Sequence, residues 1–259
     1  MRQTIVAEND PVRGACIATL AHEYPRGSCV ANHAHGSDQL VYASSGIMEI
    51  ASGRNLWVLP PHFGLWIPSR VQHQIRMPED VSMRTLYLRP GLHSGWHACT
   101  VFHVAPLLRE LIFEIVRIRN LRTRNSVERA IRDLLVALLK RATPLPTGVS
   151  LPRDPRALAV AQVVVEDPSI RRSLAIMCRD AGVSVRTLQR AFRREVGMDF
   201  ESWRRQVRLM KAVQFLVSGR TVKETAYSVG YQEPSAFVAL FRATFGTTPK
   251  AWISSIERI

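Results

Sequence analysis

Three histidines and one glutamine in the N-terminal half of the chain carry side chains that bind transition metals. They follow the pattern His33-x-His35-x3-Gln39, and His73 comes further along the chain. Alternate residues of a β-strand share one face, so we expect His33, His35 and Gln39 on one side of a strand and His73 on a neighbouring strand. Three imidazoles and an amide oxygen suit Ni, Zn, Co or Cu. The alternative is a metal-free polar pocket that binds an organic effector or only packs.

A second set of side chains with recognisable chemistry lies in a short basic segment near residue 190. Its polar side chains are Ser184, Arg186, Gln189, Arg190 and Arg193. Arginine forms two hydrogen bonds with guanine O6 and N7, and glutamine does the same with adenine N6 and N7. The set therefore predicts contact with double-stranded DNA, although a charged, solvated helix face is the commoner origin of such a segment taken alone.

This basic segment lies in a duplicated unit, which favours DNA binding over a solvated face. Leu174–Trp203 is echoed by Val222–Trp252, with Gly182 matching Gly230 at an offset of 48 and later landmarks matching at 49. Each copy predicts a helix, a turn at its glycine and a second helix, where Ser184 is placed to cap the second helix. The buried face of that helix is predicted to be Leu188, Ala191, Phe192 and Val196. Two helix-turn-helix units result.

The second copy offers fewer base-reading side chains on its outer face. Its corresponding residues are Gln232, Glu233, Ser235, Ala239 and Arg242. Small and apolar side chains meet phosphates and thymine methyl groups but make few bidentate base contacts. We therefore expect the first unit to carry more of the sequence discrimination and the second mostly to position the protein.

The landmarks of this repeat resemble the AraC/XylS family of bacterial transcription regulators. The matching residues are Gly-Tyr-Gln at 230–232, Phe237, Phe241, Phe-Gly at 245–246 and Thr-Pro at 248–249. The resemblance implies two helix-turn-helix units joined by a long helix, here Phe200 to about Val217, which would span roughly 25 Å. A helix of that length places two recognition helices in successive major grooves.

The N-terminal half has the residue pattern of a β-sheet protein. Six short segments are rich in β-branched, aromatic and other apolar residues: Gln39–Ala43, Gly46–Ile50, Asn55–Leu59, Gly64–Ile67, Gln72–Met77 and Met83–Leu88. Their close spacing predicts a small β-barrel or jelly roll. The histidine motif with Gly46, together with Pro68-x4-His73, is similar to the two motifs of cupins and implies a cupin-type sensor domain. Gln39 stands where metal-binding cupins usually have glutamate.

Helical periodicity begins at Pro106 and predicts an antiparallel hairpin, part of which would form a homodimer contact. The apolar stripes are Leu107, Leu108, Leu111, Ile112, Ile115 and Val116, then Val127, Ile131, Leu134, Leu135 and Leu138. The proline-rich segment 141–155 predicts a linker, followed by a helix at Arg156–Glu166. The predicted fold is α+β: a cupin-like sensor β-barrel at 1–104, a helical dimerisation segment and linker at 105–150, and a DNA-binding domain at 151–259.

Composition narrows the class of protein. The chain has 35 Lys and Arg against 21 Asp and Glu, a net charge of +14, which favours a polyanionic partner. No signal peptide or membrane-length apolar run is visible, so we expect no membrane partner. Four cysteines lack the spacing of a disulfide framework or metal module, which favours reduced thiols and a cytoplasmic protein. They are Cys16, Cys29, Cys99 and Cys178. A further group, His93, His97, Cys99 and His103, matches no zinc module.

The sequence favours a sequence-specific transcriptional regulator, not an enzyme, that responds to a small ligand or metal ion in the cupin-like domain. Its expected partners are double-stranded DNA, the effector, a second copy of the chain and, as a candidate, RNA polymerase. One alternative is a cupin metalloenzyme with a DNA-binding appendage, but an iron oxygenase needs a carboxylate where this chain has Gln39. A second alternative is a DNA-binding regulator that responds to no ligand.

Overall fold

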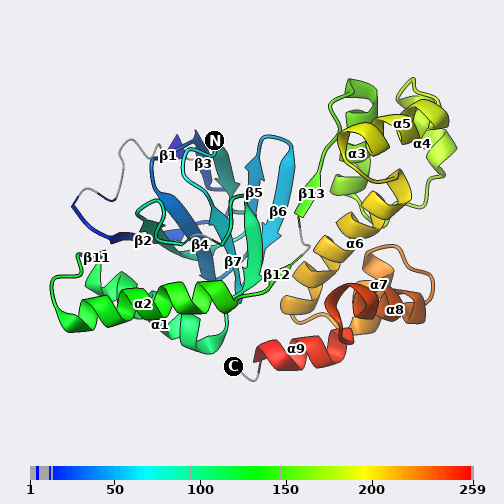
Figure 1. Ribbon diagram of the computed structural model, residues 1–259. Coiled ribbons are helices and arrows are strands. Elements are labelled where there is room, and N and C mark those ends of the chain that lie inside the picture. The colour runs from blue at the N-terminus through cyan, green and yellow to red at the C-terminus, as the bar shows by residue number, and fades with distance from the viewer. Residues whose placement is uncertain (1–3, 6–11, 13, 94, 146–147, 258–259) are drawn as a thin grey trace. The chain divides into compact units, whose positions relative to one another are not determined.

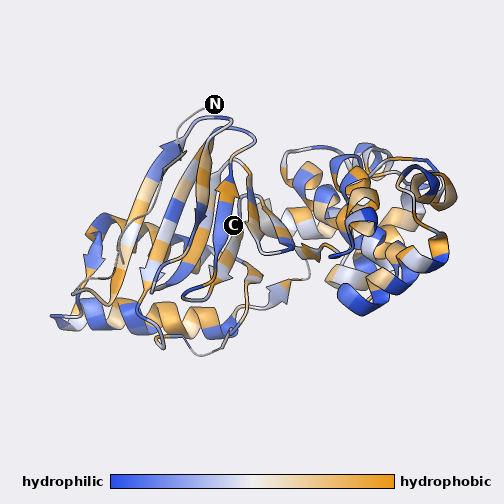
Figure 2. Ribbon diagram, turned by 90° about the horizontal axis from the view of Figure 1, so that it is seen from above, coloured by the Kyte–Doolittle hydropathy of each residue, from blue (hydrophilic) through white to orange (hydrophobic). Residues whose placement is uncertain are grey.

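The computed structural model describes residues 4–5, 12, 14–93, 95–145 and 148–257. The chain divides into two compact units (Figure 1). The first consists mainly of Met1–Gly53 and Leu59–Pro146, and the second of Arg54–Val58 with Thr147–Arg258. The helices carry both hydrophilic and hydrophobic residues (Figure 2), and none among the described residues combines the length and apolar character that a membrane crossing requires.

The first unit is built from two β-sheets and a pair of helices. The strands of the whole chain are β1 (Thr4–Ile5), β2 (Ile17–Tyr24), β3 (Cys29–His33), β4 (Asp38–Ser45), β5 (Met48–Ser52), β6 (Asn55–Leu59), β7 (Phe63–Ile67), β8 (His73–Arg76), β9 (Val81–Leu88), β10 (Thr100–His103), β11 (Asn120–Leu121), β12 (Pro144–Leu145) and β13 (Gly148–Ser150). The larger sheet has the order β11-β2-β9-β4-β7-β10-β12, and the smaller sheet contributes β1-β3-β8-β5 to this unit.

The central strand β4 is covered on both faces. Leu40 and Tyr42 belong to the apolar cluster that holds the two helices, α1 (Pro106–Ile118) and α2 (Ser126–Arg141). Gln39 points to the opposite face, where its amide meets His35, the residue that follows β3 by two positions. Every residue from Asp38 to Ala43 is buried, because helices lie over one face and the smaller sheet over the other.

The prediction of a closed β-barrel is corrected: the sheets do not close on one another. The edge strands β1, β11 and β12 are each two residues long. Strands this short cannot form the hydrogen-bonded ladder that would join the edge of one sheet to the edge of the other. The α+β class is correct, with mainly antiparallel sheets first and helices after them.

The predicted helical hairpin is present as α1 and α2, but its apolar stripes are narrower than predicted. The buried members are Leu108, Leu111, Ile112 and Ile115 on α1, and Leu135 with Leu139 on α2. Three predicted stripe residues are instead exposed, Leu107 (55%), Val127 (65%) and Leu134 (40%). These side chains lie on the faces of the helices that point away from the sheet.

The proline-rich segment predicted to be a linker contains two short strands. Strand β12 pairs with β10 in the first unit, and β13 pairs with β6 in the second. The indole Nε1 of Trp203 donates a hydrogen bond to the carbonyl of Ser150 at 2.8 Å, and Gln206 donates through Nε2 to the carbonyl of Gly148 at 2.7 Å. These bonds attach β13 to the helical core of the second unit.

The second unit is otherwise helical. Its helices are α3 (Pro155–Glu166), α4 (Leu174–Asp180), α5 (Val185–Glu195), α6 (Phe200–Val217), α7 (Val222–Ser228), α8 (Pro234–Phe245) and α9 (Pro249–Glu257). The pairs α4–α5 and α7–α8 are the two predicted helix-turn-helix units, and α6 is the predicted long helix between them. Helix α3 begins one residue before the predicted start.

The duplication extends to the aromatic contacts that hold each copy. The rings of Phe192 and Trp203 have centroids 5.2 Å apart, and those of Phe241 and Trp252, both 49 residues later, have centroids 5.5 Å apart. Edge-to-face packing of this kind stabilises beyond the burial of area alone. Each copy therefore fixes its second helix against the helix that follows it.

Candidate nucleic-acid interface and metal centre

Helix α5 is held in place by its cap and its buried face. The Ser184 hydroxyl accepts a hydrogen bond from the Thr187 amide at 3.1 Å, which confirms the predicted N-cap. The turn before it contains Gly182 at φ +64°, and Gly230 takes φ +86° at the equivalent place in the second copy. Leu188 and Phe192 are fully buried, so the orientation of α5 about its own axis is fixed.

The outward face of α5 is strongly basic. Arg186, Arg190 and Arg193 are exposed, and no ion pair joins them to any residue in the described part of the chain. By contrast, the neighbouring Arg194 is paired with Glu195 at 2.6 Å. Arginines that are not committed within the protein remain available for phosphates and guanine edges.

Gln189 has a contact that spacing alone did not predict. Its Oε1 accepts a hydrogen bond from the Phe200 amide at 3.3 Å, at the start of α6. The side chain is half-buried. One lone pair of its carbonyl oxygen is therefore engaged within the protein, and the amide NH2 group remains to meet a base.

Helix α8 presents a different surface. Gln232, Glu233, Ser235, Ala239 and Arg242 are all exposed, as expected for an outer face. Glu233 is the N-cap residue but makes no capping bond with its side chain. Arg242 is the basic residue of the last turn, so this face offers one guanidinium where α5 offers three.

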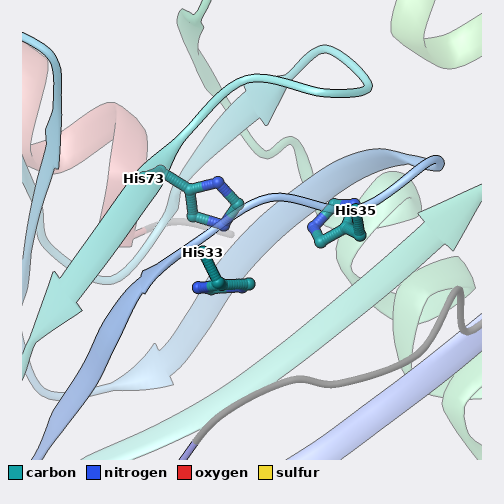
Figure 3. A group of neighbouring side chains, drawn as sticks. All are labelled: His33, His35 and His73. Atoms are coloured by element: carbon teal, nitrogen blue, oxygen red, sulfur yellow. The ribbon is translucent and has the colours of Figure 1, made fainter.

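The histidine cluster of the first unit comes from three separate elements (Figure 3). His33 is the last residue of β3, His35 lies in the connection to β4, and His73 is the first residue of β8. The prediction that His33, His35 and Gln39 share one strand is therefore wrong, because the chain turns between His33 and Asp38. The prediction that His73 lies on a neighbouring strand is correct, since β3 pairs with β8.

Each of the three rings is oriented by a backbone carbonyl. Nδ1 of His33 lies 2.8 Å from the Ala31 oxygen, Nδ1 of His35 lies 2.9 Å from the Ser37 oxygen, and Nδ1 of His73 lies 2.9 Å from the Val71 oxygen. A carbonyl oxygen only accepts, so Nδ1 carries the proton in each ring. With Nδ1 engaged in this way, each ring turns Nε2 away from the backbone, which is the arrangement of metal-binding histidines.

His73 has the most constrained ring of the three. It is fully buried, and its Nε2 has no hydrogen-bond partner. Burial lowers the pKa of His73 to about 4, with the neighbouring His33 and His35 adding to the effect. The ring is therefore neutral at physiological pH, and its lone pair faces the cluster, whose ligand atoms all lie within 4.8 Å of one another.

Gln39 completes this group from the larger sheet. Its Oε1 lies 3.0 Å from Nε2 of His35. If that ring is neutral, two acceptors face each other, and the contact becomes favourable when the amide is turned or when a cation binds both atoms. Two atoms that each lie about 2.1 Å from one ion are roughly 3.0–3.4 Å apart at ordinary coordination angles.

The environments of Tyr87 and His93 could not be predicted from the sequence. Tyr87 on β9 lies edge-on to His35, with ring centroids 5.1 Å apart, and burial raises its pKa to about 12. Both ring nitrogens of His93 are buried without a partner, between the indoles of Trp66 and Trp96. Within the described residues, the group His33, His35 and His73 is the one with metal-ligand geometry, and the group around His97 and Cys99 lacks it.

Comparison with known proteins gives matches to both halves of the chain. Residues 177–255 match the family model described as a helix-turn-helix domain. The chain is 26% identical over 227 residues to the HTH-type transcriptional regulator NimR of Escherichia coli (strain K12), which covers 88% of this chain and 83% of that protein. It is 36% identical over 102 residues to the HTH-type transcriptional regulator RipA of Corynebacterium glutamicum, which covers 39% of this chain and 31% of RipA.

Solved structures give weaker likenesses. Fatty-acid-bound ToxT from Vibrio cholerae is 12% identical, covers 92% of this chain and 94% of its own, and has a TM-score of 0.40. The DNA-binding domain of AdpA in complex with a target DNA is 26% identical, covers 39% of this chain and 91% of its own, and has a TM-score of 0.37. Both TM-scores are low, so neither likeness transfers a ligand or a DNA contact to this chain.

Proposed function

We propose that the chain is a DNA-binding transcriptional regulator of the AraC/XylS family and that it binds a two-part DNA site through α5 and α8. The observation that carries the proposal is the contrast between the two outward faces. Helix α5 exposes Arg186, Arg190 and Arg193, and α8 exposes mainly small and polar side chains. Helix α5 reads bases, and α8 fixes the register of the protein on the duplex.

A selection from random-sequence duplex DNA with the full-length protein tests this proposal. The expected result is a two-part motif in which one half is more strongly specified, with protection of both halves in a footprint. Arg153, exposed at the loop before α3, provides a charge-matched control for substitutions on α5. Recovery of no motif, or protection of one half alone, would contradict the proposal.

We further propose that the first unit senses a divalent metal ion through His33, His35 and His73, with Gln39 as a fourth ligand. The main support is the buried, unpartnered Nε2 of His73, because a lone pair without a partner costs stability unless it serves a ligand. Three imidazoles without thiolate or carboxylate suit Ni, Zn, Co or Cu. Binding would favour one conformation of the sensor unit over another, and so change DNA affinity as a population shift.

Elemental analysis and titration calorimetry on the purified protein test the metal proposal. Stoichiometric metal is expected for the wild type and for the control His97→Ala, whose side chain is exposed. It is expected to be lost in both His33→Ala and His73→Ala. Failure of the wild-type protein to bind any of the four metals would favour an organic effector, or none, in the same place.

Two copies of the chain are proposed to act together. Val127 and Leu134 are exposed, and their spacing of seven residues on α2 puts them on one face of that helix. This face is proposed to make the homodimer contact. As a regulator of transcription in a bacterium, the dimer would act in the cytoplasm, with RNA polymerase as a further partner at the promoter.

A further inference from the structure

We propose that Arg208 on α6 braces the two helix-turn-helix units against each other and thereby sets the spacing between the two halves of the DNA site. The inference rests on the proposed two-part site. Arg208 lies on the connecting helix and not on α5 or α8, the two helices proposed to contact DNA. The role assigned to it is therefore to position those helices.

Arg208 is attached to the first helix-turn-helix through the loop between α3 and α4. Its Nε donates a hydrogen bond to the carbonyl of Pro168 at 3.0 Å. One turn earlier on α6, Arg204 donates to the carbonyl of Ile170. The loop between α3 and α4 is itself stiff, because the Asp167 carboxylate accepts hydrogen bonds from the amide of Ser169 at 2.9 Å and from its hydroxyl at 2.5 Å.

The same guanidinium contacts the turn between α7 and α8 in the second helix-turn-helix. Its central carbon lies 5.5 Å from the centre of the Tyr231 ring, within the range of a cation–π contact. Gly230 lies so close that a Cβ there would be 2.8 Å from Nη2 of Arg208 and 3.0 Å from Cα of Ser169. The loop before the first helix-turn-helix and the turn within the second are thus packed around the Arg208 side chain.

This contact differs from an ordinary surface salt bridge. No carboxylate of the described chain lies within ion-pair distance of Arg208, although its guanidinium is partly withdrawn from water. The hydroxyl of Tyr231 is buried without a hydrogen-bond partner, so that residue is held by its ring and not by its polar end. A cation held by a carbonyl and an aromatic face has a fixed direction, which a mobile surface ion pair lacks.

The mechanical consequence concerns rotation about α6. Helix α6 has 18 residues, is about 27 Å long, and packs against α7 of the second helix-turn-helix. The Arg208 contact adds an attachment beside that helix and so restricts rotation of one helix-turn-helix relative to the other. One added base pair moves half-sites apart by about 3.4 Å and rotates them by about 34°, so a braced protein distinguishes spacings that an unbraced protein tolerates.

The experiment measures affinity for the selected DNA site and for versions with one base pair added to or removed from the spacer. Wild type is expected to prefer the selected spacing by about tenfold or more. In Arg208→Gln and Tyr231→Leu the preference should fall to about threefold or less, mainly by improved relative binding to the altered spacers. Tyr231→Phe, which removes only the unpartnered hydroxyl, and Arg205→Gln, an exposed arginine on the same helix, should keep the wild-type preference.

The alternative roles of Arg208 give different results. If Arg208 contacts a phosphate, Arg208→Gln weakens binding to all spacings equally and lowers the salt dependence, and Arg208→Lys restores both. If Arg208 only stabilises the fold, the variants unfold at lower temperature and keep the spacing preference. Either result would contradict the proposal that Arg208 braces the two helix-turn-helix units. If the wild type shows no two-part site, the proposed DNA-binding mode fails first, and the selection reveals this before any variant is made.

Discussion

His33 and His73 are directly opposite each other in the β3–β8 ladder, and their ring centroids are 4.3 Å apart. In each, Nδ1 is bonded to the carbonyl two residues earlier in the chain. The pairing of two strands therefore fixes both the distance between the rings and the nitrogen each one presents. The cluster is pre-organised by backbone geometry before any ligand arrives.

Substitution of His73 should separate metal binding from folding. In His73→Phe the unpartnered Nε2 disappears, but the bond to Val71 is lost, so the metal-free stability should stay within about 1 kcal/mol of wild type. An ion at a hundred times its Kd should stabilise wild type by about 2.7 kcal/mol and the variant hardly at all. Thermal unfolding with and without Ni or Zn measures both quantities. A variant that keeps the metal-dependent shift would rule His73 out as a ligand.

The contrast between α5 and α8 predicts opposite changes in specificity. Arg190→Ala should reduce binding to the selected site by about 1–3 kcal/mol more than binding to random DNA, because a bidentate base contact is lost. Ser235→Ala should change both by a similar, small amount. Competition binding at fixed salt measures the two ratios. The assignment would be reversed if Arg190→Ala lost the same affinity for the selected site and for random DNA while Ser235→Ala relaxed specificity.

His93 predicts a specific pH dependence of stability. Burial lowers its pKa below the ordinary 6.5, so the unfolded ring takes up a proton at a higher pH than the folded ring does. Stability from this group is complete above pH 6.5 and is lost as the pH falls below it. His93→Phe should therefore lose less stability than wild type between pH 7.5 and 5.5. Urea unfolding at the two pH values measures the difference. The prediction would be contradicted if wild type, His93→Phe and the exposed control His22→Phe lost the same free energy of unfolding between the two pH values.

The exposed face of α2 predicts a dimer that a charge can weaken. Leu134→Lys and Val127→Lys should each raise the dimer dissociation constant by about tenfold or more, because a lysine would lose water in an apolar contact. Sedimentation velocity over a range of concentrations measures the constant. Leu20→Lys changes an exposed apolar residue on β2 and should leave it unaltered. A monomeric wild type, or equal effects of all three substitutions, would place the interface elsewhere.

The helical half of the chain could be predicted closely from sequence because its signals are local. Ser184, Gly182 and the apolar spacing of α5 act within a few residues. Helix α6 begins and ends where the family resemblance implied. The position of Gln189 was less predictable. Its contact with the Phe200 amide depends on how α5 and α6 cross, which spacing along one helix does not contain.

The sheets were harder to predict because their strands depend on distant partners. Strand β2 was missed, since four of its eight residues, from Leu20 to Glu23, are exposed and break the alternation. The histidine motif identified the right residues but the wrong arrangement. His33 and His35 were placed on one strand by their spacing, whereas the ladder with β8 brings His33 and His73 together across forty residues of sequence.

Strand β13 has a consequence for where this chain can be cut. The helical unit takes in Arg54–Val58, and its Trp203 donates to Ser150, so a fragment that begins at residue 151 lacks part of its own core. Val149 would be removed from the apolar cluster that contains Phe192 and Trp203. Gene fusions that exchange DNA-binding halves at this boundary would produce fragments with weakened folds. The motif that defines the module in sequence comparison is smaller than the body that folds.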